Sequence, residues 1–295
     1  MRIENLPVKP CNLCSELKAV RLLYRKEHYS IVRCETCSLT YTDGIPFSTA
    51  ELGKIYSADY FAKGAKYEVR LTNVSCLNAE QRLKQVLALN DLRLDKWLDV
   101  GCATGDFLVA AKSLVKEVHG IEISNFAASQ ARARGLDKVT VVNFLEADLL
   151  SNEFDLVSMW DVIEHLQDPK AAFKKAFEIL KPGGYLVLST GDIQSKLARL
   201  TGRYWHLMTP QDHLYFFSQL TMERMLMATG FHLISISYPG KRVPLDFMIH
   251  KLSRLFLPKA SNSVLRLVKL FRLGKVVPTV NLADIMTIQA RKSLE

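Results

Sequence analysis

LDVGCATGDFL, from Leu98 to Leu108, is the stretch of sequence that decides the fold. An apolar run that ends at Val100 predicts a buried strand, and the apolar residues from Phe107 onward recur with helical spacing. The glycines between these segments predict a tight turn, because glycine adopts backbone conformations that other residues avoid. A helix that begins just after such a turn offers free N–H groups to polar or anionic ligand atoms. We therefore expect a strand, a turn and a helix that together bind a nucleotide-type cofactor.

The spacing of the turn glycines argues against a dinucleotide as the cofactor. The dinucleotide fingerprint places three glycines in the pattern G-x-G-x-x-G, whereas position 103 of this chain is alanine. The run from Asp99 to Gly105 instead resembles motif I of the class I methyltransferases that use S-adenosylmethionine (SAM). The alternative is an ordinary strand, turn and helix of some other α/β protein.

Strand and helix patterns alternate regularly after Lys96. Regular alternation predicts a doubly wound, mostly parallel sheet with helices on both faces. The resemblance adds that this α/β fold is Rossmann-like and seven-stranded, and it covers roughly residues 95–240 and 283–292. Asp168 and Pro169 predict the start of a helix, as N-cap and first helical residue. We expect strands at 97–100, 118–123, 139–145, 154–160, 231–238 and 284–289, and one more that ends at Leu188.

Acidic residues at successive strand ends are the candidates for holding the cofactor. Glu122 lies seventeen positions after Gly105, close to where a carboxylate that binds ribose hydroxyls belongs. The resemblance assigns the contact with the adenine amino group to Asp148. A single acid of this kind is more often a solvated carboxylate in a loop. Acids at the ends of successive strands favour a cofactor-binding site, because those strand ends lie together. The cofactor-binding residues that we expect are Asp99, Gly101, Cys102, Gly105, Glu122, Ile123, Asp148 and Trp160.

Two Cys-x-x-Cys pairs near the start of the chain predict a zinc ribbon over residues 1–45. Nineteen residues separate the pairs, a spacing typical of a zinc ion held by four thiolates. A segment this short buries too little surface to fold alone, so the metal supplies the missing stability. Four thiolates leave no open coordination position, which favours a structural role with Cys11, Cys14, Cys34 and Cys37 as ligands. The alternative is a ribbon that also docks substrate or nucleic acid, through Arg21, Arg25, Lys26 and Arg33.

Composition places the chain among soluble globular proteins of one or two domains. It has 295 residues, of which 48% are hydrophobic, and neither an apolar leader nor a long uninterrupted apolar run. We therefore expect a cytoplasmic protein whose cysteines stay reduced. The formal net charge is +9. Almost all of this excess lies between residues 241 and 275, which argues against a surface that binds a polyanion along its whole length.

Two further segments accompany the sheet within this organisation. Residues 46–94 are interpreted as a helical connector with a helix at about 72–90, which either caps the cofactor pocket, as the resemblance implies, or simply packs its tyrosines. The SAM-binding domain spans 95–295 and includes a basic helical insert at 241–282, before the last strand. Three roles are open for this insert: a lid on the substrate cleft, a membrane-surface contact, or the interface of a homodimer.

The residues that follow the fourth strand are the candidates for catalysis. Asp161, Glu164 and His165 stand in the order D-x-x-E-H, and His213 lies in a later loop. They resemble the metal-binding set of small-RNA 2′-O-methyltransferases, in which the first ligand is Glu, and a related set in quinone O-methyltransferases. We expect His165 or His213 to act as general base, with Glu164 assisting. The alternatives are a divalent metal (Mg²⁺, Mn²⁺ or Zn²⁺) bound by all four residues, or a purely structural Glu-His pair.

These features together predict a SAM-dependent methyltransferase that acts on an oxygen or carbon of a small molecule. Its zinc ribbon and the run HLYFFS at 213–218 resemble bacterial methyltransferases of polysaccharide, deoxysugar and antibiotic pathways, so the expected acceptor is a sugar or glycan precursor. The residues at 159–162 differ from the motif that methylates base amines, and no basic stretch is interleaved with aromatics. The alternative is an RNA ribose methyltransferase whose ribbon and insert bind phosphates.

Overall fold

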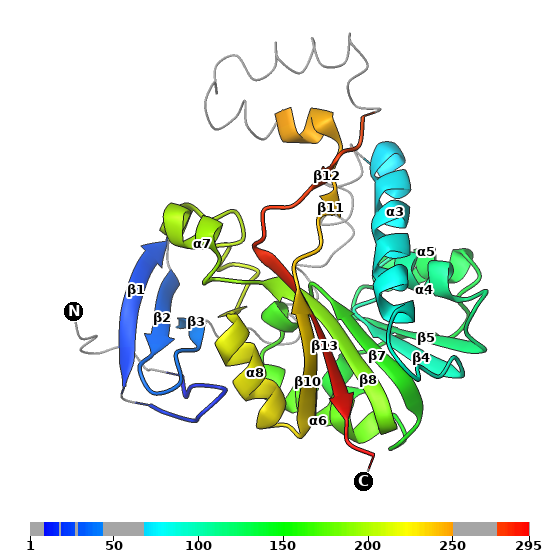
Figure 1. Ribbon diagram of the computed structural model, residues 1–295, viewed down its shortest axis with the longest axis horizontal. Coiled ribbons are helices and arrows are strands. Elements are labelled where there is room, and N and C mark those ends of the chain that lie inside the picture. Colours follow the sequence, from blue (N-terminus) through cyan, green and yellow to red (C-terminus); the bar gives the residue numbers. More distant parts are fainter. Residues whose placement is uncertain (1–8, 18, 27–28, 44–67, 250–275, 295) are drawn as a thin grey trace.

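A seven-stranded sheet lies at the centre of the molecule (Figure 1). The computed structural model describes residues 9–17, 19–26, 29–43, 68–249 and 276–294. The predicted doubly wound, mostly parallel sheet is confirmed, with one antiparallel strand, β13, inserted between β8 and β10. In spatial order the strands are β10 (Phe231–Ser237), β13 (Ile285–Lys292), β8 (Leu180–Gly191), β7 (Phe154–Trp160), β4 (Lys96–Val100), β5 (Glu117–Glu122) and β6 (Val139–Val141).

Helices cover both faces of this sheet, as the alternation of patterns predicts. All residues of the central strand β7 are buried, which is typical of a parallel strand that has helices on either side. One apolar cluster contains side chains from α6 (Pro169–Ile179) and α8 (Gln219–Met227). A second cluster contains side chains from α3 (Glu68–Leu87), α4 (Asp106–Ala111) and α5 (Asn125–Ala133).

The glycine turn after β4 has the left-handed backbone that its sequence predicts. Gly101 has a φ of +67° and Gly105, the N-cap residue of α4, a φ of +82°. A Cβ at Gly105 would lie 2.3 Å from Cδ1 of Leu136 and 3.2 Å from Cβ of Ala131, so α5 packs directly on the turn. Glycine at 105 therefore serves both the backbone conformation and the close approach of the next helix.

The cysteine-bearing segment and the central domain share a second sheet. Its strands, in spatial order, are β1 (Val20–Lys26), β2 (Tyr29–Cys34), β3 (Thr40–Asp43) and β9 (Tyr215–Phe216). Thr40 of β3 pairs with Phe216 of β9, which lies far along the chain in the central domain. Although the sequence suggests a separate ribbon over residues 1–45, its sheet is completed by a strand from outside it.

Polar contacts between the ribbon and helix α6 reinforce this shared sheet. Asn12 donates a hydrogen bond to Asp168 (2.8 Å) and accepts one from the backbone N–H of Lys170 (2.9 Å). Asp168 is the predicted N-cap of α6, and its side chain also accepts from Ala171 N–H. Lys170 Nζ donates to the carbonyl of Leu13 at 2.9 Å. The start of α6 is therefore a docking point for the loop that carries the first cysteine pair.

Several elements differ in extent from the sequence expectation. The third strand ends at Val141 rather than 145, because Asn143 caps a short 3-10 helix, η1 (Phe144–Glu146), by accepting from Leu145 N–H. The helix expected at 72–90 is α3, which begins and ends earlier. The first part of the connector (46–67) and most of the basic insert (250–275) lie outside the described residues.

The described ends of the insert form a short strand pair. β11 (Lys241–Arg242) is antiparallel to β12 (Thr279–Val280), and residues 245–249 are helical. Within the described part of the chain, no helix has both the length and the apolar character needed to cross a bilayer.

We predict that Gly105→Ala lowers the free energy of unfolding by about 2–4 kcal/mol, because the new methyl group meets Leu136 while the backbone remains left-handed. Gly135→Ala is the matched control: Gly135 has a φ of +78°, but its added Cβ meets only the flexible end of Lys112, at 3.3 Å. This control should cost about 1 kcal/mol in urea unfolding. Equal losses in the two variants would contradict close packing at Gly105.

Candidate active site

The carboxyl ends of β4, β5 and β7 meet at one edge of the sheet, where ligands of open α/β folds bind. Glu122 closes β5 there and is 6% exposed. One oxygen of its carboxylate accepts from the backbone N–H of Ala103, within the glycine turn, at 2.9 Å. The other accepts from Ser124 N–H at 2.8 Å. Burial raises the pKa of Glu122, while these hydrogen bonds favour its ionised form. The predicted ribose-binding acid thus lies against the predicted cofactor turn.

The other expected cofactor residues are distributed around this turn. Asp99 is buried in β4 and accepts a hydrogen bond from Ser158 Oγ at 2.6 Å. Burial raises the pKa of Asp99 to about 7. Cys102 is buried in the turn, Ile123 is half-buried, and Asp148 is exposed after η1. Asp99 is therefore shielded from solvent, whereas Asp148 is open to it.

Trp160, at the end of β7, forms one wall of the site. Its ring packs edge-on against Phe107, with 5.2 Å between ring centroids. The guanidinium of Arg82, from α3, lies 4.8 Å from the centroid of the Trp160 ring. The indole N–H is buried and has no hydrogen-bond partner in the described structure. A buried donor without a partner is costly, so Trp160 is a candidate for binding a ligand acceptor.

Asp161, the next residue, is held by two cations that the sequence analysis did not include in the site. Its carboxylate lies 2.8 Å from Arg82 Nη2 and 2.8 Å from Lys241 Nζ of β11, and it accepts from Ser189 Oγ at 2.8 Å. Burial opposes ionisation of Asp161, but the charges of Lys241 and Arg82 outweigh it and hold its pKa well below the usual range.

Glu164, His165 and His213 form a compact group beyond Asp161. Each contributes a ligand-type atom, and these atoms all lie within 4.8 Å of one another. The rings of His165 and His213 meet edge to face, with 4.7 Å between centroids. His165 Nδ1 lies 2.8 Å from the carbonyl oxygen of Asp212, which can only accept, so Nδ1 carries the proton.

The electrostatic environment keeps His213 neutral near pH 7. Burial, with the neighbouring charge of His165, lowers the pKa of His213 to about 4. Glu164 is 4% exposed, and one of its carboxylate oxygens, Oε2, is buried without a hydrogen-bond partner in the described structure. Burial raises the pKa of Glu164, against the opposing effect of His165. The group therefore contains an unprotonated imidazole beside a carboxyl group that is short of partners.

A family model described as a methyltransferase domain matches residues 70–236, which include the turn, Trp160 and His165. The chain belongs to this methyltransferase family. Its relatives include the ubiquinone biosynthesis O-methyltransferase of Vibrio parahaemolyticus, 26% identical over 58% of this chain and 88% of that protein. The enzyme of the same name from Xanthomonas oryzae is 34% identical over 37% of this chain, which spans about half of its length (48%).

A solved structure shares the fold of this chain. A SAM-dependent methyltransferase of Thermotoga maritima, described as a possible histamine N-methyltransferase, superposes with a TM-score of 0.53 at 22% identity. The superposition covers 79% of this chain and 98% of that one. The expected fold is therefore confirmed, and the family model confirms the identification as a SAM-dependent methyltransferase.

Three of the four residues in the expected metal set come together in the described structure. Among the described residues the group contains Glu164, His165 and His213 but not Asp161. The reason is electrostatic, since Asp161 is already neutralised by Arg82 and Lys241. No sequence pattern marks these two cations, because they come from α3 and β11, whose positions depend on tertiary packing.

Strand β3 of the ribbon supports the loop that carries His213. The hydroxyl of Thr42 donates to the carbonyl of His213 at 3.0 Å, and its backbone N–H donates to Leu214 O at 2.8 Å. Leu214 N–H in turn donates to the carbonyl of Glu164 at 2.8 Å. The ribbon thus takes part in holding the two catalytic candidates Glu164 and His213 side by side.

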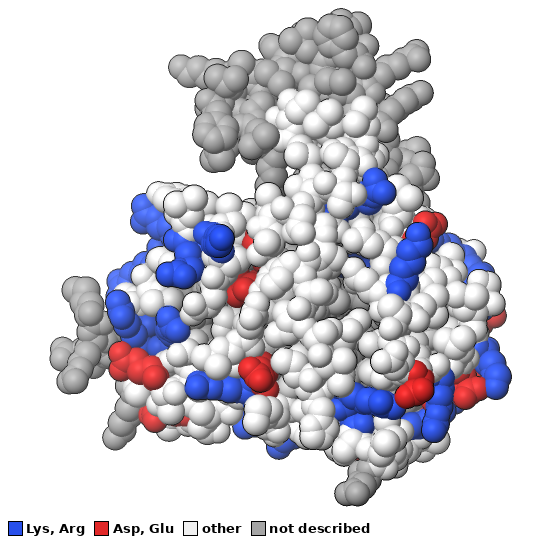
Figure 2. All heavy atoms as spheres, in the orientation of Figure 1, with Lys and Arg blue, Asp and Glu red and all other residues white. Residues whose placement is uncertain are grey.

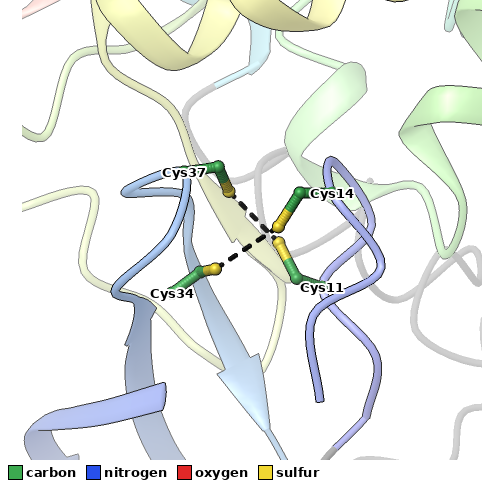
Figure 3. A group of neighbouring side chains, drawn as sticks. All are labelled: Cys11, Cys14, Cys34 and Cys37. Carbon is green, nitrogen blue, oxygen red and sulfur yellow. Dashed lines mark hydrogen bonds between the residues drawn. The ribbon is translucent and has the colours of Figure 1, made fainter. Parts of the chain in front are cut away.

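The four expected cysteines converge at the base of the ribbon, as Figure 3 shows. The sulfur atoms of Cys11 and Cys37 lie 3.4 Å apart, and those of Cys14 and Cys34 lie 3.5 Å apart. Tetrahedral zinc bonds of about 2.3 Å would separate thiolates by about 3.8 Å. The cluster therefore has nearly the dimensions of a four-thiolate zinc site, and it fits the metal that the spacing predicts.

We predict that His213 makes stability depend on pH between 6.5 and 4. In this window the unfolded chain binds a proton that the folded chain excludes, so stability is complete above pH 6.5 and falls as the pH decreases. The loss by pH 4 should be up to about 3 kcal/mol in urea unfolding. His213→Gln should remove it, whereas His232→Gln, at an exposed position, should leave it unchanged. A pH dependence unaltered by His213→Gln would contradict this assignment.

Proposed function

We propose that this methyltransferase transfers the methyl group of SAM to a hydroxyl oxygen of a small molecule, with His213 as the general base. The observation that carries the proposal is the position of the His213 imidazole, packed against His165 and Glu164 beyond the end of β7. Relatives named as O-methyltransferases support oxygen as the acceptor atom. For the acceptor itself we retain the sequence-based expectation of a sugar or glycan precursor.

The residues around the glycine turn fit SAM. Gly101 and Gly105 give the turn its left-handed backbone, and the buried indole N–H of Trp160 has no hydrogen-bond partner in the described structure. Glu122 would accept from the ribose hydroxyls, and Arg82, stacked on Trp160, would face the carboxylate end of the cofactor. SAM supplies a methyl group on a sulfonium, which is already activated for displacement. The protein's main task is therefore to align the acceptor oxygen with that methyl group.

An alcohol is a weak nucleophile until its proton is removed. A neutral His213 can take that proton on a ring nitrogen as the oxygen attacks, and Glu164 beside it stabilises the imidazolium that results. General-base catalysis of this kind contributes about 10²- to 10⁴-fold to rate. His165, fixed by Asp212, would orient the partner ring.

A second candidate role for the same group is binding of a divalent metal. It is favoured by Glu164, whose buried Oε2 has no hydrogen-bond partner in the described structure and whose carboxylate lies within 4.8 Å of ligand atoms on two imidazoles. A mixed nitrogen and oxygen ligand set suits Zn²⁺ or Mn²⁺, and a bound metal would lower the pKa of an acceptor hydroxyl.

We predict that His213→Gln lowers kcat about 10²- to 10⁴-fold and leaves SAM affinity unchanged, because the imidazole acts on the acceptor only. Glu122→Gln should instead weaken SAM binding about tenfold or more, since an ionised acceptor of hydrogen bonds is lost. S-adenosylhomocysteine release, with catechols and sugar nucleotides as trial acceptors, measures the first effect, and calorimetry measures the second.

The outcomes of these measurements separate the two roles of the histidine group. Activity that survives exhaustive chelation supports the general base, whereas activity restored by Mn²⁺ or Zn²⁺ supports the metal. Full activity of both His165→Gln and His213→Gln would overturn the proposed function.

We further propose that the cysteine cluster binds one structural zinc ion. Cys34→Ser should abolish zinc in native mass spectrometry and lower the unfolding temperature, because the metal stabilises the small sheet. Cys76→Ser is the matched control, since Cys76 is half-buried in α3 and lies outside the cluster. Its zinc content should equal that of the unmodified chain, and equal zinc in Cys34→Ser would refute the site.

A further inference from the structure

One side of the molecule carries cations for which the described structure provides no acidic partner. Figure 2 shows Lys and Arg gathered over β1 and α7 (Lys196–Thr201), at the left of the view. None of them forms an ion pair with any described residue. The exposed members define what we call the basic patch: Arg21, Arg25, Lys196, Arg199 and Arg203.

The sequence around α7 contains no acidic residue that would offset the charge of the basic patch. From 193 to 206 the chain contains three Lys or Arg residues and no acid. Across the β1–β2 pair, Arg21 stands directly opposite Arg33. Like charges at opposed positions of an antiparallel pair are unfavourable, so this arrangement does not stabilise the ribbon. A surface of this kind attracts anionic partners.

Two exposed apolar side chains lie among these cations. Leu200 is 86% exposed and Tyr204 is 74% exposed, the highest values for any large hydrophobic side chain in the described part of the chain. The guanidinium of Arg203 lies 4.9 Å from the centroid of the Tyr204 ring, and its Nη2 donates to the Tyr204 hydroxyl at 2.7 Å. Leu200 and Tyr204 are therefore exposed to solvent next to arginine side chains.

Buried side chains already fill the interior beneath this surface, which leaves Leu200 and Tyr204 on the outside. Beneath α7 and the following turn, η3 (Gly202–Tyr204), lies a filled apolar cluster that includes Ile31, Trp205 and Met208. Trp205 Nε1 donates to the buried Asp284 at 2.8 Å, and His206 Nε2 lies 2.7 Å from the same oxygen. Leu200 and Tyr204 are consequently held outward by the packing behind them.

We propose that the basic patch is a contact surface for an anionic lipid bilayer, with Leu200 and Tyr204 entering the interface. Lipid headgroups would neutralise the arginines, and the acyl boundary would accept the leucine and the tyrosine ring. The phosphates and bases of a nucleic acid would contact the cations and the Tyr204 ring, but a nucleic acid has no apolar region in which Leu200 would be buried. The proposal is independent of which group acts as the base in methyl transfer.

Flotation of the full-length protein with lipid vesicles tests this surface. Binding should be strong to phosphatidylcholine vesicles that contain phosphatidylglycerol, and weak to phosphatidylcholine alone. Each neutralised arginine should weaken binding about fivefold, so the pair Arg199→Gln and Arg203→Gln should weaken it about 25-fold. The pair Leu200→Ser and Tyr204→Ser should weaken it at high salt as well, where headgroup attraction is screened.

Matched controls are available elsewhere on the surface. Lys174→Gln with Leu150→Ser removes one exposed cation and one leucine of 71% exposure from other parts of the molecule, and it should bind as the unmodified protein does. Circular dichroism confirms that each variant folds. Undiminished binding of both patch variants would overturn the proposal, because any attraction would then come from another part of the chain. Loss of affinity for a single-stranded RNA, without loss of vesicle binding, would equally overturn it in favour of a nucleic acid.

Discussion

The ionised carboxylate of Asp161 ties three distant elements to the end of the central strand. Arg82 comes from the helix before the sheet, Ser189 from β8, and Lys241 from the strand that opens the insert. Without this charge the two cations would face each other unopposed. Partly buried ion pairs add little net stability, because desolvation offsets their attraction, but they define position. In the sequence Asp161 also lies between Trp160 and Glu164, so the expected cofactor residue and the histidine group both adjoin the position that it fixes.

Much of the central domain could be predicted from the sequence, because its signals are local. The turn at Gly101 and Gly105 is encoded by residues that tolerate a left-handed backbone. The start of α6 is likewise encoded locally, by Asp168 as N-cap and Pro169 as the first helical residue. The third strand was predicted too long because its β pattern continues past Asn143. The side chain of Asn143 accepts a hydrogen bond from the backbone N–H of Leu145, and this bond favours the short helix η1 over a longer strand. The pattern of apolar residues does not show where a side-chain hydrogen bond will end a strand.

The candidate site was predictable only in part, for a reason that follows from the topology. Glu122 and Glu164 follow strands, and the order of the strands determines where those residues lie. Arg82 and Lys241 reach the site through the packing of α3 and the pairing of β11, and neither event has a signature in the surrounding sequence. The pairing of Asp161 with these two cations was not predicted for the same reason, since its partners were unknown until the elements were placed.

The sharing of a strand between the ribbon and the central domain has a consequence for folding order. Cys37 accepts a hydrogen bond from Arg224, 187 residues away, and β3 pairs with β9 close to that point. During translation the cysteine-bearing segment leaves the ribosome before the central domain does, so its sheet keeps an unpaired edge until β9 has been made. Such edges promote association with other nascent chains. A metal ion bound early by the cysteines would hold the small sheet together, but its edge at β3 would stay open until β9 is made.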